Sequence, residues 1–383
     1  MRWSGYRGSS NGTPRPLVAV TAAVAVLVTL AMGVVLAPAA AGIPPGDATA
    51  HLQAEFDQLA PGQTLVLEPG TYQHSDILTI RVPGVQIDGN GATLVATNDA
   101  RSGLQIWADG VSIRNMNLAA PLAGQRYYGT DQHKLLVRAD GVTLSNVTIT
   151  GSAAAGVYIA GASNFRLDQV TVRDTRADGI AMSAGSSAGQ VNNALTERTG
   201  DDGISVVSYT DRYRGYRGPP CRDIVIDSPV VNGTTQARGL IVSGGENIVF
   251  RNINVSNTSS AGVLITSQAD PIYTSPVNGV EISGGSITNA NTAPRVMKGA
   301  IAVYSGYLPI TGVRISDLTI ADTPATAERN ITVEAVGGGD VSDVSIHDIR
   351  LTRTDLPAVY SNVPADRIQA SGFTRDDAPI DSP

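Results

Sequence analysis

The sequence predicts an all-β fold, a parallel β-helix of about ten coils with a short capping helix at its N-terminal end. Two observations carry this prediction: an eight-residue pattern recurs along most of the chain, and a short apolar segment precedes most copies. The composition agrees, because 41 of the 383 residues are glycine and only 16% are charged. Such a composition is typical of β-rich chains with many tight turns.

Each copy of the pattern combines a β-branched strand, a polar corner and a second short strand. The shortest spacings are 23 and 24 residues, and the spacings of 31 to 35 residues contain inserted loops. Self-similarity at this period is typical of a solenoid, and alternating apolar residues favour strands over helices. Stacked asparagine side chains at the corner are expected to hydrogen-bond along the column. The corner residues are Asn115, Asn146, Gln169, Ser228, Asn252, Gly284, Asp317 and Asp348.

A third apolar strand is predicted before each pair, so each coil contains three strands. We expect every strand to stack on its equivalent in the next coil over residues 48–365, with a C-terminal tail at 366–383. The amphipathic segment 51–60 is the predicted capping helix. The third strands are expected at residues 103–106, 134–137, 156–159, 179–182, 203–206, 239–242, 262–265 and 300–303.

The first 41 residues have the features of a secretory leader. They contain three arginines and no acidic residue, and an apolar run from Leu17 to Leu36 ends in small residues. We interpret residues 1–41 as a signal peptide. The alternative is an uncleaved N-terminal anchor, because the run is long enough to span a bilayer. The protein is therefore expected to be secreted, or held at the outer face of the membrane.

Charge and cysteine content exclude several classes of protein. The formal net charge is −7, or about −10 without the leader arginines, which argues against general nucleic-acid binding. Cys221 is the only cysteine, so an exported fold must be stable without internal disulfide bonds. No P-loop, nucleotide-type glycine fingerprint or Cys/His metal spacing occurs. Among four scattered histidines, only His133 falls near the candidate site described next.

An aspartate pair marks the candidate site. The residues that directly precede the third strand in three successive coils are Asp178, Asp202 and Arg238, and Asp201 stands beside Asp202. Because stacked strands lie about 4.8 Å apart, we expect these four residues to meet on one face. Repulsion among the acids should raise at least one carboxyl pKa and supply one protonated acid beside one charged base.

A purely structural role is the alternative for these aspartates. Asp-Gly is an ordinary turn, and the same letters occur at Asp109 and Asp140, which are predicted to be corners. Asp178 could be structural in the same way, and Arg238 could simply neutralise the acids. A turn needs only one such side chain, so the Asp201–Asp202 pair favours a functional role.

The chain resembles known families at two levels. The segments "GQTLVLEPGTY" and "VPGVQIDGNGATL" resemble the opening of pectate-lyase-like right-handed β-helix proteins, a resemblance that covers nearly all of residues 48–360. The segments "TRADGIAM", "RTGDDGISV" and "ARGLIVSG" resemble glycoside hydrolase family twenty-eight, the polygalacturonases. This second resemblance implies hydrolysis with inversion by Asp178, Asp201 and Asp202, with Asp202 as the acid and the other two activating water.

Two motifs depart from the polygalacturonase pattern. Arg238 stands where that family has a histidine, and Leu264 and Thr266 stand where it has an arginine and a lysine. In the family those two cations bind the carboxylate of the uronate. Their replacement argues against galacturonan as the substrate, whereas acid–base hydrolysis needs neither of them.

Inserted loops are expected to wall the site and to bind a glycan. The longest insertion, residues 208–221, is rich in tyrosine and arginine, and tyrosine rings stack on sugars while arginines bind hydroxyl or acidic groups. A second insertion at 121–133 brings Arg126, Tyr127 and Tyr128, and a third near 267–276 brings Tyr273. The predicted substrate-binding residues are Arg238, Tyr158, Tyr209, Arg212, Tyr213 and Arg214.

Three functions follow from these residues. The first is a secreted, monomeric glycoside hydrolase that acts on a polysaccharide and needs no metal or other cofactor. The second is a Ca²⁺-dependent polysaccharide lyase or epimerase, in which the three aspartates hold the cation and Arg238 abstracts a proton. The third is a non-catalytic glycan-binding β-helix protein, in which the aspartates only end turns.

Overall fold

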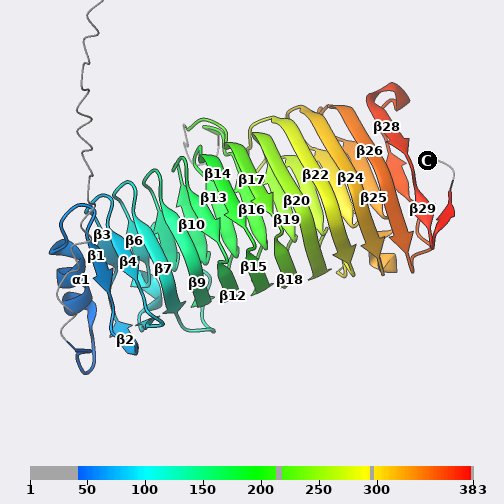
Figure 1. The fold of residues 1–383 in the computed structure, drawn as a ribbon. Helices are drawn as coiled ribbons and strands as arrows, with labels where there is room; N and C mark the ends of the chain where they lie inside the picture. The colour runs from blue at the N-terminus through cyan, green and yellow to red at the C-terminus, as the bar shows by residue number, and fades with distance from the viewer. Residues whose placement is uncertain (1–41, 213–217, 294–296, 381–383) are drawn as a thin grey trace, which may run out of the picture. The chain divides into compact units, whose positions relative to one another are not determined.

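The computed structural model describes residues 42–212, 218–293 and 297–380 (Figure 1). These residues form a parallel β-helix, which confirms the predicted fold class. In this part of the chain one sheet has 19 strands and a second has 11, and a single α-helix, α1 (Thr49–Asp57), precedes them. The predicted leader, residues 1–41, lies outside the described residues. Among the described residues no helix is long and apolar enough to cross a bilayer.

The 11-stranded sheet contains the predicted third strands, each paired in parallel with its equivalent in the next coil. Most predicted positions agree with the observed bounds to within one or two residues. The strands are β3 (Leu78–Ile80), β6 (Leu104–Ile106), β8 (Leu135–Val137), β10 (Val157–Ala160), β13 (Ile180–Ser183), β16 (Ile204–Val207), β19 (Leu240–Ser243), β21 (Val263–Ser267), β23 (Ile301–Ser305), β25 (Ile331–Ala335) and β27 (Val359–Ser361).

The 19-stranded sheet contains the two strands of each repeat and bends at the polar corner between them. The corner residues Asn115, Asn146 and Asn252 have φ between 51° and 53°, the left-handed conformation that asparagine tolerates well. The strands are β1 (Thr64–Val66), β2 (Thr71–His74), β4 (Gln86–Asp88), β5 (Thr93–Ala96), β7 (Ser112–Ala119), β9 (Thr143–Ser152), β11 (Arg166–Asp168), β12 (Thr171–Thr175), β14 (Ser187–Asn192), β15 (Leu195–Thr199), β17 (Arg222–Asp227), β18 (Val230–Thr234), β20 (Gly245–Thr258), β22 (Val277–Thr288), β24 (Ile310–Ala321), β26 (Val341–Thr352), β28 (Ile368–Ser371), β29 (Thr374–Arg375) and β30 (Ala378–Pro379).

Hydrogen bonds between corner side chains support the stacking in part. Asn146 donates to Asn115 Oδ1 at 2.9 Å, as the sequence predicted for stacked asparagines. Asn252 instead donates to Asp227 Oδ1 at 3.0 Å, because the residue below it in the column is a serine. The corner column is therefore joined by side-chain bonds whose acceptors vary from coil to coil.

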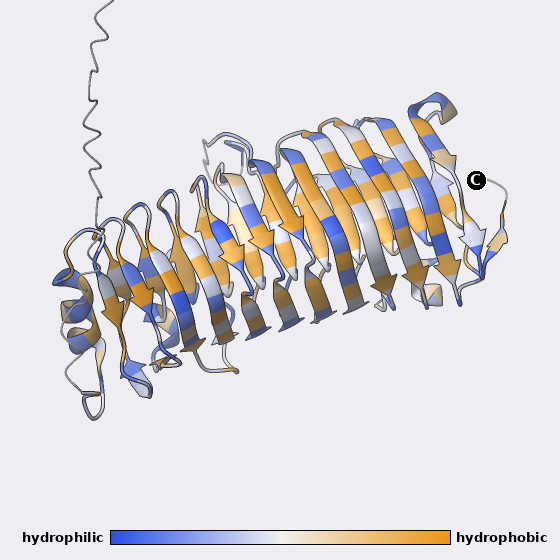
Figure 2. Ribbon diagram, in the orientation of Figure 1, coloured by the Kyte–Doolittle hydropathy of each residue, from blue (hydrophilic) through white to orange (hydrophobic). Residues whose placement is uncertain are grey.

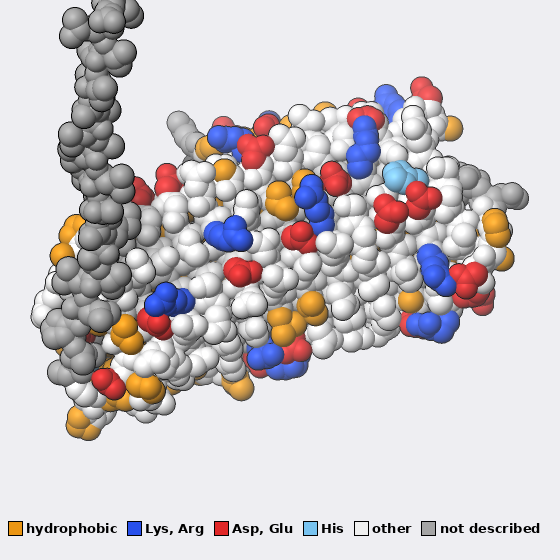
Figure 3. Space-filling model, in the orientation of Figure 1, with side chains coloured by type: hydrophobic (Ala, Val, Ile, Leu, Met, Phe, Trp, Pro, Cys, Tyr) orange, Lys and Arg blue, Asp and Glu red, His pale blue; other side chains and the backbone are white. Residues whose placement is uncertain are grey.

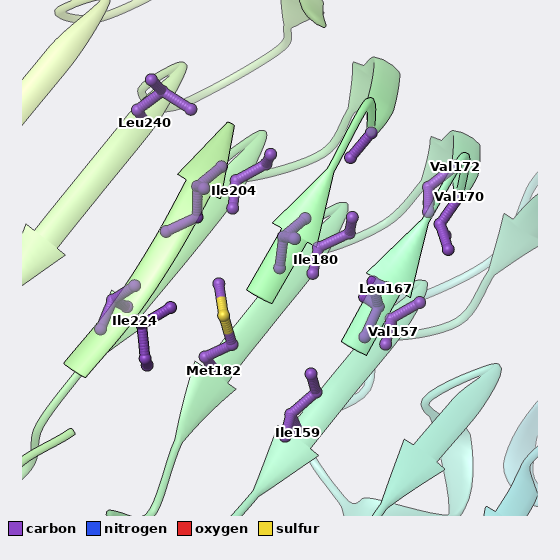
Figure 4. Close-up of a cluster of buried hydrophobic side chains, with 14 of the residues drawn as sticks. Val157, Ile159, Leu167, Val170, Val172, Ile180, Met182, Ile204, Ile224 and Leu240 are labelled. Carbon is purple, nitrogen blue, oxygen red and sulfur yellow. The ribbon is translucent and has the colours of Figure 1, made fainter. Parts of the chain in front are cut away.

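The core fills the interior of the coils with stacked aliphatic side chains. Val157, Ile180, Ile204 and Leu240 are paired in register on successive strands and are fully buried (Figure 4). Burying one such side chain stabilises the fold by roughly 1.5–3 kcal/mol. Along the strands apolar and polar residues alternate (Figure 2), so a slip of one residue would turn the apolar set outward. This cost fixes the register that places the site residues.

Helix α1 caps the first coil, as predicted. Leu52 and Phe56 are buried against the core, and Gln53 hydrogen-bonds both backbone groups of Thr79, at 2.9 and 2.8 Å. These bonds satisfy part of the open edge of β3, which would otherwise be free to pair with another chain. The helix runs from Thr49 to Asp57, so it begins two residues before and ends three residues before the predicted bounds.

The other end of the β-helix differs from the prediction. Strand β28 and strand β29 pair in parallel with β26, although both lie in the segment predicted to be a tail, residues 366–383. The short apolar segments there were too weak a pattern to recognise. On the face shown in Figure 3, basic and acidic side chains lie next to one another. Ion pairs between exposed side chains include that of Arg314 with Asp343 at 2.8 Å.

Candidate active site

The site begins as a row of residues that stack along the 11-stranded sheet. The amide of Gly179 donates to the carbonyl of Asp202, and that of Gly203 donates to the carbonyl of Arg238, both at 2.9 Å. Asp178, Asp202 and Arg238 therefore occupy equivalent positions in successive coils, as the sequence predicted. A Cβ atom at Gly203 would lie 2.6 Å from the carbonyl oxygen of Gly239. Glycine is thus required after the aspartate for the coils to approach each other.

Three carboxyl groups meet at this row. One oxygen of each of Asp178, Asp201 and Asp202 lies within 4.8 Å of one oxygen of each of the others. Asp202 is the most deeply buried of the three, with only 4% of the residue exposed. Asp178 accepts a hydrogen bond from Ser205 Oγ at 2.6 Å. The cluster is therefore a compact group of acids on the floor of a pocket.

Two arginines are paired with two of these acids. Arg238 donates to Asp202 Oδ2 at 2.8 Å, and its backbone amide donates to Asp202 Oδ1 at 3.0 Å. Arg126 contacts Asp201 Oδ2 at 2.6 Å from the inserted loop 121–133. Asp178 has no arginine partner among the described residues, so its hydrogen bond from Ser205 is its main polar contact.

Burial and mutual repulsion raise two of the carboxyl pKa values. Burial raises the pKa of Asp178, and the negative charge of Asp201 adds to that rise. Burial also raises the pKa of Asp202, against the opposing charge of Arg238, and the charges of Asp201 and Asp178 add to the rise. The cluster therefore retains a proton at a pH where an exposed aspartate has lost its own. A retained proton beside an ionised carboxylate is the requirement for general acid–base chemistry.

The pocket above the acids has a volume of about 340 Å³. Tyr158 lies on its wall and stacks on His133, with ring centroids 4.2 Å apart and planes 5° from parallel. The Nδ1 atom of His133 accepts a hydrogen bond from the amide of Ala155 at 3.1 Å. Burial, with a further contribution from the charge of Arg138, lowers the pKa of His133 to about 4. His133 is therefore a neutral, stacked wall residue.

A buried arginine holds the inserted loop over the acids. Arg176 donates to both carboxylate oxygens of Asp99, at 2.8 and 2.7 Å, and to the carbonyls of Pro121 and Gln125, both at 2.9 Å. The residue after Gln125 is Arg126, which contacts Asp201. Arg176 therefore positions the loop, and through it Arg126. The sequence placed Arg126 in a wall loop but gave no sign of its contact with Asp201.

The remaining predicted residues have different positions. Tyr209 lines the pocket with Tyr158. Arg212 does not line it, because its guanidinium lies over the rings of Tyr273 and Tyr307, 5.6 Å from each centroid. This placement does not test whether Arg212 binds substrate, and that role stays a prediction. Tyr213 and Arg214 lie outside the described residues.

Apolar side chains from the second half of the β-helix complete the pocket. Ile241 and Ile272 line it, together with Gln268. The positions where polygalacturonases have two cations are Leu264 and Thr266, and both are fully buried here. Among the described residues that line the pocket, every arginine is already paired with an aspartate.

Comparisons with known proteins agree with the observed fold. Residues 83–270 match the family model described as "Right handed beta helix region". The match covers a little under half of the chain, and together with the observed strands it identifies the fold as a right-handed parallel β-helix. None of the curated proteins compared with the sequence matches it. The match concerns the helical coils themselves, so it carries no statement about chemistry at the acids.

Solved structures with the same fold include carbohydrate-active enzymes. The catalytic domain of a GH87 α-1,3-glucanase in complex with nigerose is 17% identical, with a TM-score of 0.64 over 88% of this chain and 67% of that one. The catalytic unit of a thermostable GH87 α-1,3-glucanase from Streptomyces thermodiastaticus is 16% identical, with a TM-score of 0.62 over 88% and 67%. The A-module of a mannuronan C-5 epimerase from Azotobacter vinelandii is 16% identical, with a TM-score of 0.63 over 89% and 98%. These likenesses show the β-helix fold and do not single out the polygalacturonases.

Proposed function

We propose that this β-helix protein is a glycoside hydrolase that cleaves a polysaccharide by acid–base catalysis at Asp178, Asp201 and Asp202. The observation that carries the proposal is the cluster of three carboxyl groups in a walled pocket, where burial and repulsion raise two of the pKa values. Glycoside hydrolases use one protonated and one ionised carboxyl group in this way. Carboxyl groups in a cleft whose pKa values are shifted by burial and by neighbouring charges mark candidate functional sites.

The three acids have different environments, which suggests different roles. Asp202 is the most buried and is the proposed general acid. Asp201 is paired with Arg126 at 2.6 Å, and Asp178 is oriented by Ser205. These two carboxylates would activate the attacking water.

The stereochemical outcome tests the proposed roles of the three acids. Inverting enzymes usually hold the acid and the base about 6.5–9.5 Å apart with a water between them, whereas retaining enzymes hold them about 5–5.5 Å apart and use one as a nucleophile. The 4.8 Å limit here joins the closest oxygens of the three carboxyl groups and is compatible with either separation between group centres. Activation of water by Asp178 and Asp201, like the polygalacturonase resemblance, implies inversion, whereas retention would make one of them a nucleophile. NMR of the first anomer released by the enzyme decides between the two outcomes.

The proposed substrate is a neutral glycan. Both arginines that line the pocket are paired with aspartates, and buried Leu264 and Thr266 replace the cations that would bind a uronate. A uronate carboxylate would therefore add charge to an acidic pocket without meeting an unpaired described cation. The α-1,3-glucanase neighbours act on such a neutral glucan by their titles.

The spacing of the aspartates along the chain gives further support. Alanine variants of the GH87 α-1,3-glucanase at two adjacent aspartates, and at a third aspartate 23 positions before them, were solved in complex with oligosaccharides. Here Asp178 stands 23 positions before Asp201, and Asp202 follows directly. The agreement is expected if the two proteins hold the same three acids on adjacent coils.

The epimerase neighbour favours a second candidate, a Ca²⁺-dependent lyase or epimerase. Three carboxylates within 4.8 Å are suitable ligands for a hard cation. Two of them, however, already accept bonds from Arg126 and Arg238, which a cation would have to displace. Burial alone would lower the pKa of Arg238, but the charges of Asp202, Asp201 and Asp178 raise it above its usual value. A guanidinium held in its charged form is a poor base.

The deciding experiment is an assay on α-1,3-glucan, other neutral glucans, galacturonan and mannuronan, with and without a chelator. We expect new reducing ends from a neutral glucan in both conditions. Asp202→Asn should lower the rate at least about a hundredfold while the protein stays folded. Asp109→Asn is the matched control, because Asp109 Oδ1 accepts a bond from the amide of Asp140 in an exposed turn. Unsaturated products, or equal activity of the two variants, would refute the proposed mechanism.

A further inference from the structure

An exposed tryptophan lies on the same sheet face as the acids, outside the pocket. Trp107 directly follows β6, and Arg138 directly follows β8 in the next coil, with its amide bonded to the carbonyl of Ile106 at 3.0 Å. The same column continues through Ala160 and Ser183 to Val207, which lines the pocket. Beyond Arg138, only the small side chains of Ala160 and Ser183 lie between Trp107 and the pocket along this column.

Neighbouring side chains fix the orientation of the Trp107 ring. Its Nε1 atom donates to Gln105 Oε1 at 2.9 Å, and Gln105 Nε2 donates to Asp131 Oδ1 at 3.1 Å. The guanidinium of Arg138 lies 5.1 Å from the ring centroid. Even so, 49% of Trp107 is exposed. A rigid aromatic surface that remains open to solvent is a preformed stacking site with a low entropic cost of binding.

Planar groups connect Trp107 to the pocket wall. The positive charge of Arg138 is close enough to contribute to the lowered pKa of His133. His133 in turn stacks on Tyr158, and both line the pocket. A row of planar side chains therefore runs along the coils toward the acids: Trp107, then Arg138, then the stacked rings of His133 and Tyr158.

We propose that Trp107, supported by Arg138, is a remote binding site for a sugar unit of a polymeric, neutral substrate. The proposal rests on the proposed function, because the acids define where the chain is cut. Trp107 lies three strand spacings before the coil of Asp178, from β6 through β8 and β10 to β13. At about 4.8 Å per strand this is about 14 Å along the axis of the β-helix. The position equivalent to Trp107 in the coil of Asp178 is Ser183, five residues beyond Asp178, which adds about 16 Å along the strand at about 3.3 Å per residue. One pyranose unit of an extended chain advances by about one strand spacing, so Trp107 lies about 22 Å, or about four to five sugar units, from Asp178.

The kinetic test compares substrates of increasing length. Trp107→Ala should raise the KM for long α-1,3-glucan chains about tenfold, the effect of losing one well-stacked aromatic contact of about 1.4 kcal/mol. The variant should cleave the shortest substrates that the native enzyme accepts at the native rate, because these do not reach Trp107. Tyr360→Ala is the matched control: Tyr360 is 42% exposed under Arg329, with a guanidinium-to-ring distance of 4.2 Å, but lies six strands beyond β13 on the same sheet. An unchanged KM for long chains, or an equal loss on the shortest substrates, would overturn the proposal.

Binding can be measured separately from cleavage, because the chain has only two tryptophans, Trp3 and Trp107. In the full chain with Trp3→Phe, tryptophan emission reports on Trp107 alone. Asp202→Asn in the same chain prevents cleavage during a titration with α-1,3-glucan oligosaccharides. Emission should change with chains of about five units or more and not with the disaccharide. If the enzyme hydrolyses no glycan, the proposed function fails, but this titration still tests whether Trp107 binds sugar. If no oligosaccharide changes the emission of Trp107, the proposed binding site is refuted.

Discussion

A lysine in the core offers a test of the β-helix that is independent of the candidate site. Lys134 occupies the position that glycine holds in neighbouring coils, as at Gly103 and Gly156, and it is completely buried. Its Nζ atom lies 2.9 Å from His74 Nε2 and donates to the carbonyl of Ser102 at 3.1 Å. The Nδ1 atom of His74 lies 2.8 Å from the carbonyl of Asp76. That contact requires a proton on Nδ1 and leaves Nε2 to accept from Lys134.

Burial makes the charged form of this lysine costly. It lowers the pKa of Lys134 from its usual 10.5 to about 7. Burial, followed by the charge of Lys134, lowers the pKa of His74 from 6.5 to about 4. Below about pH 7 Lys134 is protonated in both the folded and the unfolded state, so the folded state bears the full free-energy cost of burying the charge. Between about 7 and 10.5 only the unfolded state binds it, and stability therefore rises with pH.

The expected size of this effect follows from the shift. A change from 10.5 to about 7 corresponds to about 5 kcal/mol over the whole range, at about 1.4 kcal/mol for each pKa unit. About 3 kcal/mol of it should appear between about pH 6 and about pH 9. Lys134→Met keeps the length of the side chain and removes the titrating group. From the lower to the higher pH, the free energy of unfolding of the native protein should therefore rise by about 3 kcal/mol more than that of the variant.

The assay is urea denaturation of both proteins at the two pH values, because the difference between proteins cancels the other titrating groups. The control is Lys298→Met, which changes the chain's other lysine; Lys298 is partly exposed and pairs with Glu328 at 3.0 Å. This control should follow the native pH dependence. Parallel pH profiles for the native protein and Lys134→Met would show that Lys134 is charged in the folded state or is not buried, and would refute the reasoning.

Two further predictions concern the acids and the loop above them. Because a general acid must be protonated and burial raises the pKa values of Asp178 and Asp202, the alkaline limb of kcat/KM should lie above the usual aspartate range; a limb near pH 4 would contradict the assignment. Arg176→Lys keeps the charge but cannot bond Asp99 in a bidentate manner and also hold Pro121 and Gln125. Arg176→Lys should therefore lower kcat/KM about tenfold by displacing Arg126. If so, adding Arg126→Ala to Arg176→Lys should lower kcat/KM little further. Additive losses in this double-mutant cycle would show that Arg176 acts independently of Arg126.

The sequence predicted those parts of the site that depend on the repeat. Once the apolar positions are aligned, the register of a solenoid is one-dimensional, and Asp178, Asp202 and Arg238 must stack. The same register also predicted the stacked core and the corner hydrogen bond between Asn146 and Asn115. In each of these cases the contacting residues come from adjacent coils at equivalent positions, which the spacing alone relates.

Contacts made by inserted loops could not be predicted in this way. Arg176 and Asp99 are 77 residues apart and belong to no repeating position. The bond of Arg126 to Asp201 depends on the path of the inserted loop 121–133. Arg212 likewise lies over tyrosines of two other loops, Tyr273 and Tyr307. The burial of Lys134 was missed for a related reason, because its place in the glycine column is evident only when the strand register is known. Loop paths depend on side-chain packing that no local pattern records.

The charges of the cluster connect its proton with the proposed substrate. Three carboxyl groups and two guanidinium groups share the pocket. If all were ionised, the cluster would carry one net negative charge at a site where burial penalises charge. Retaining one proton makes the cluster neutral, and that same proton is the one a general acid transfers to the leaving oxygen. A uronate would add a second negative charge and favour a further proton on the base, whereas a neutral sugar leaves both the acid and the base in their active forms.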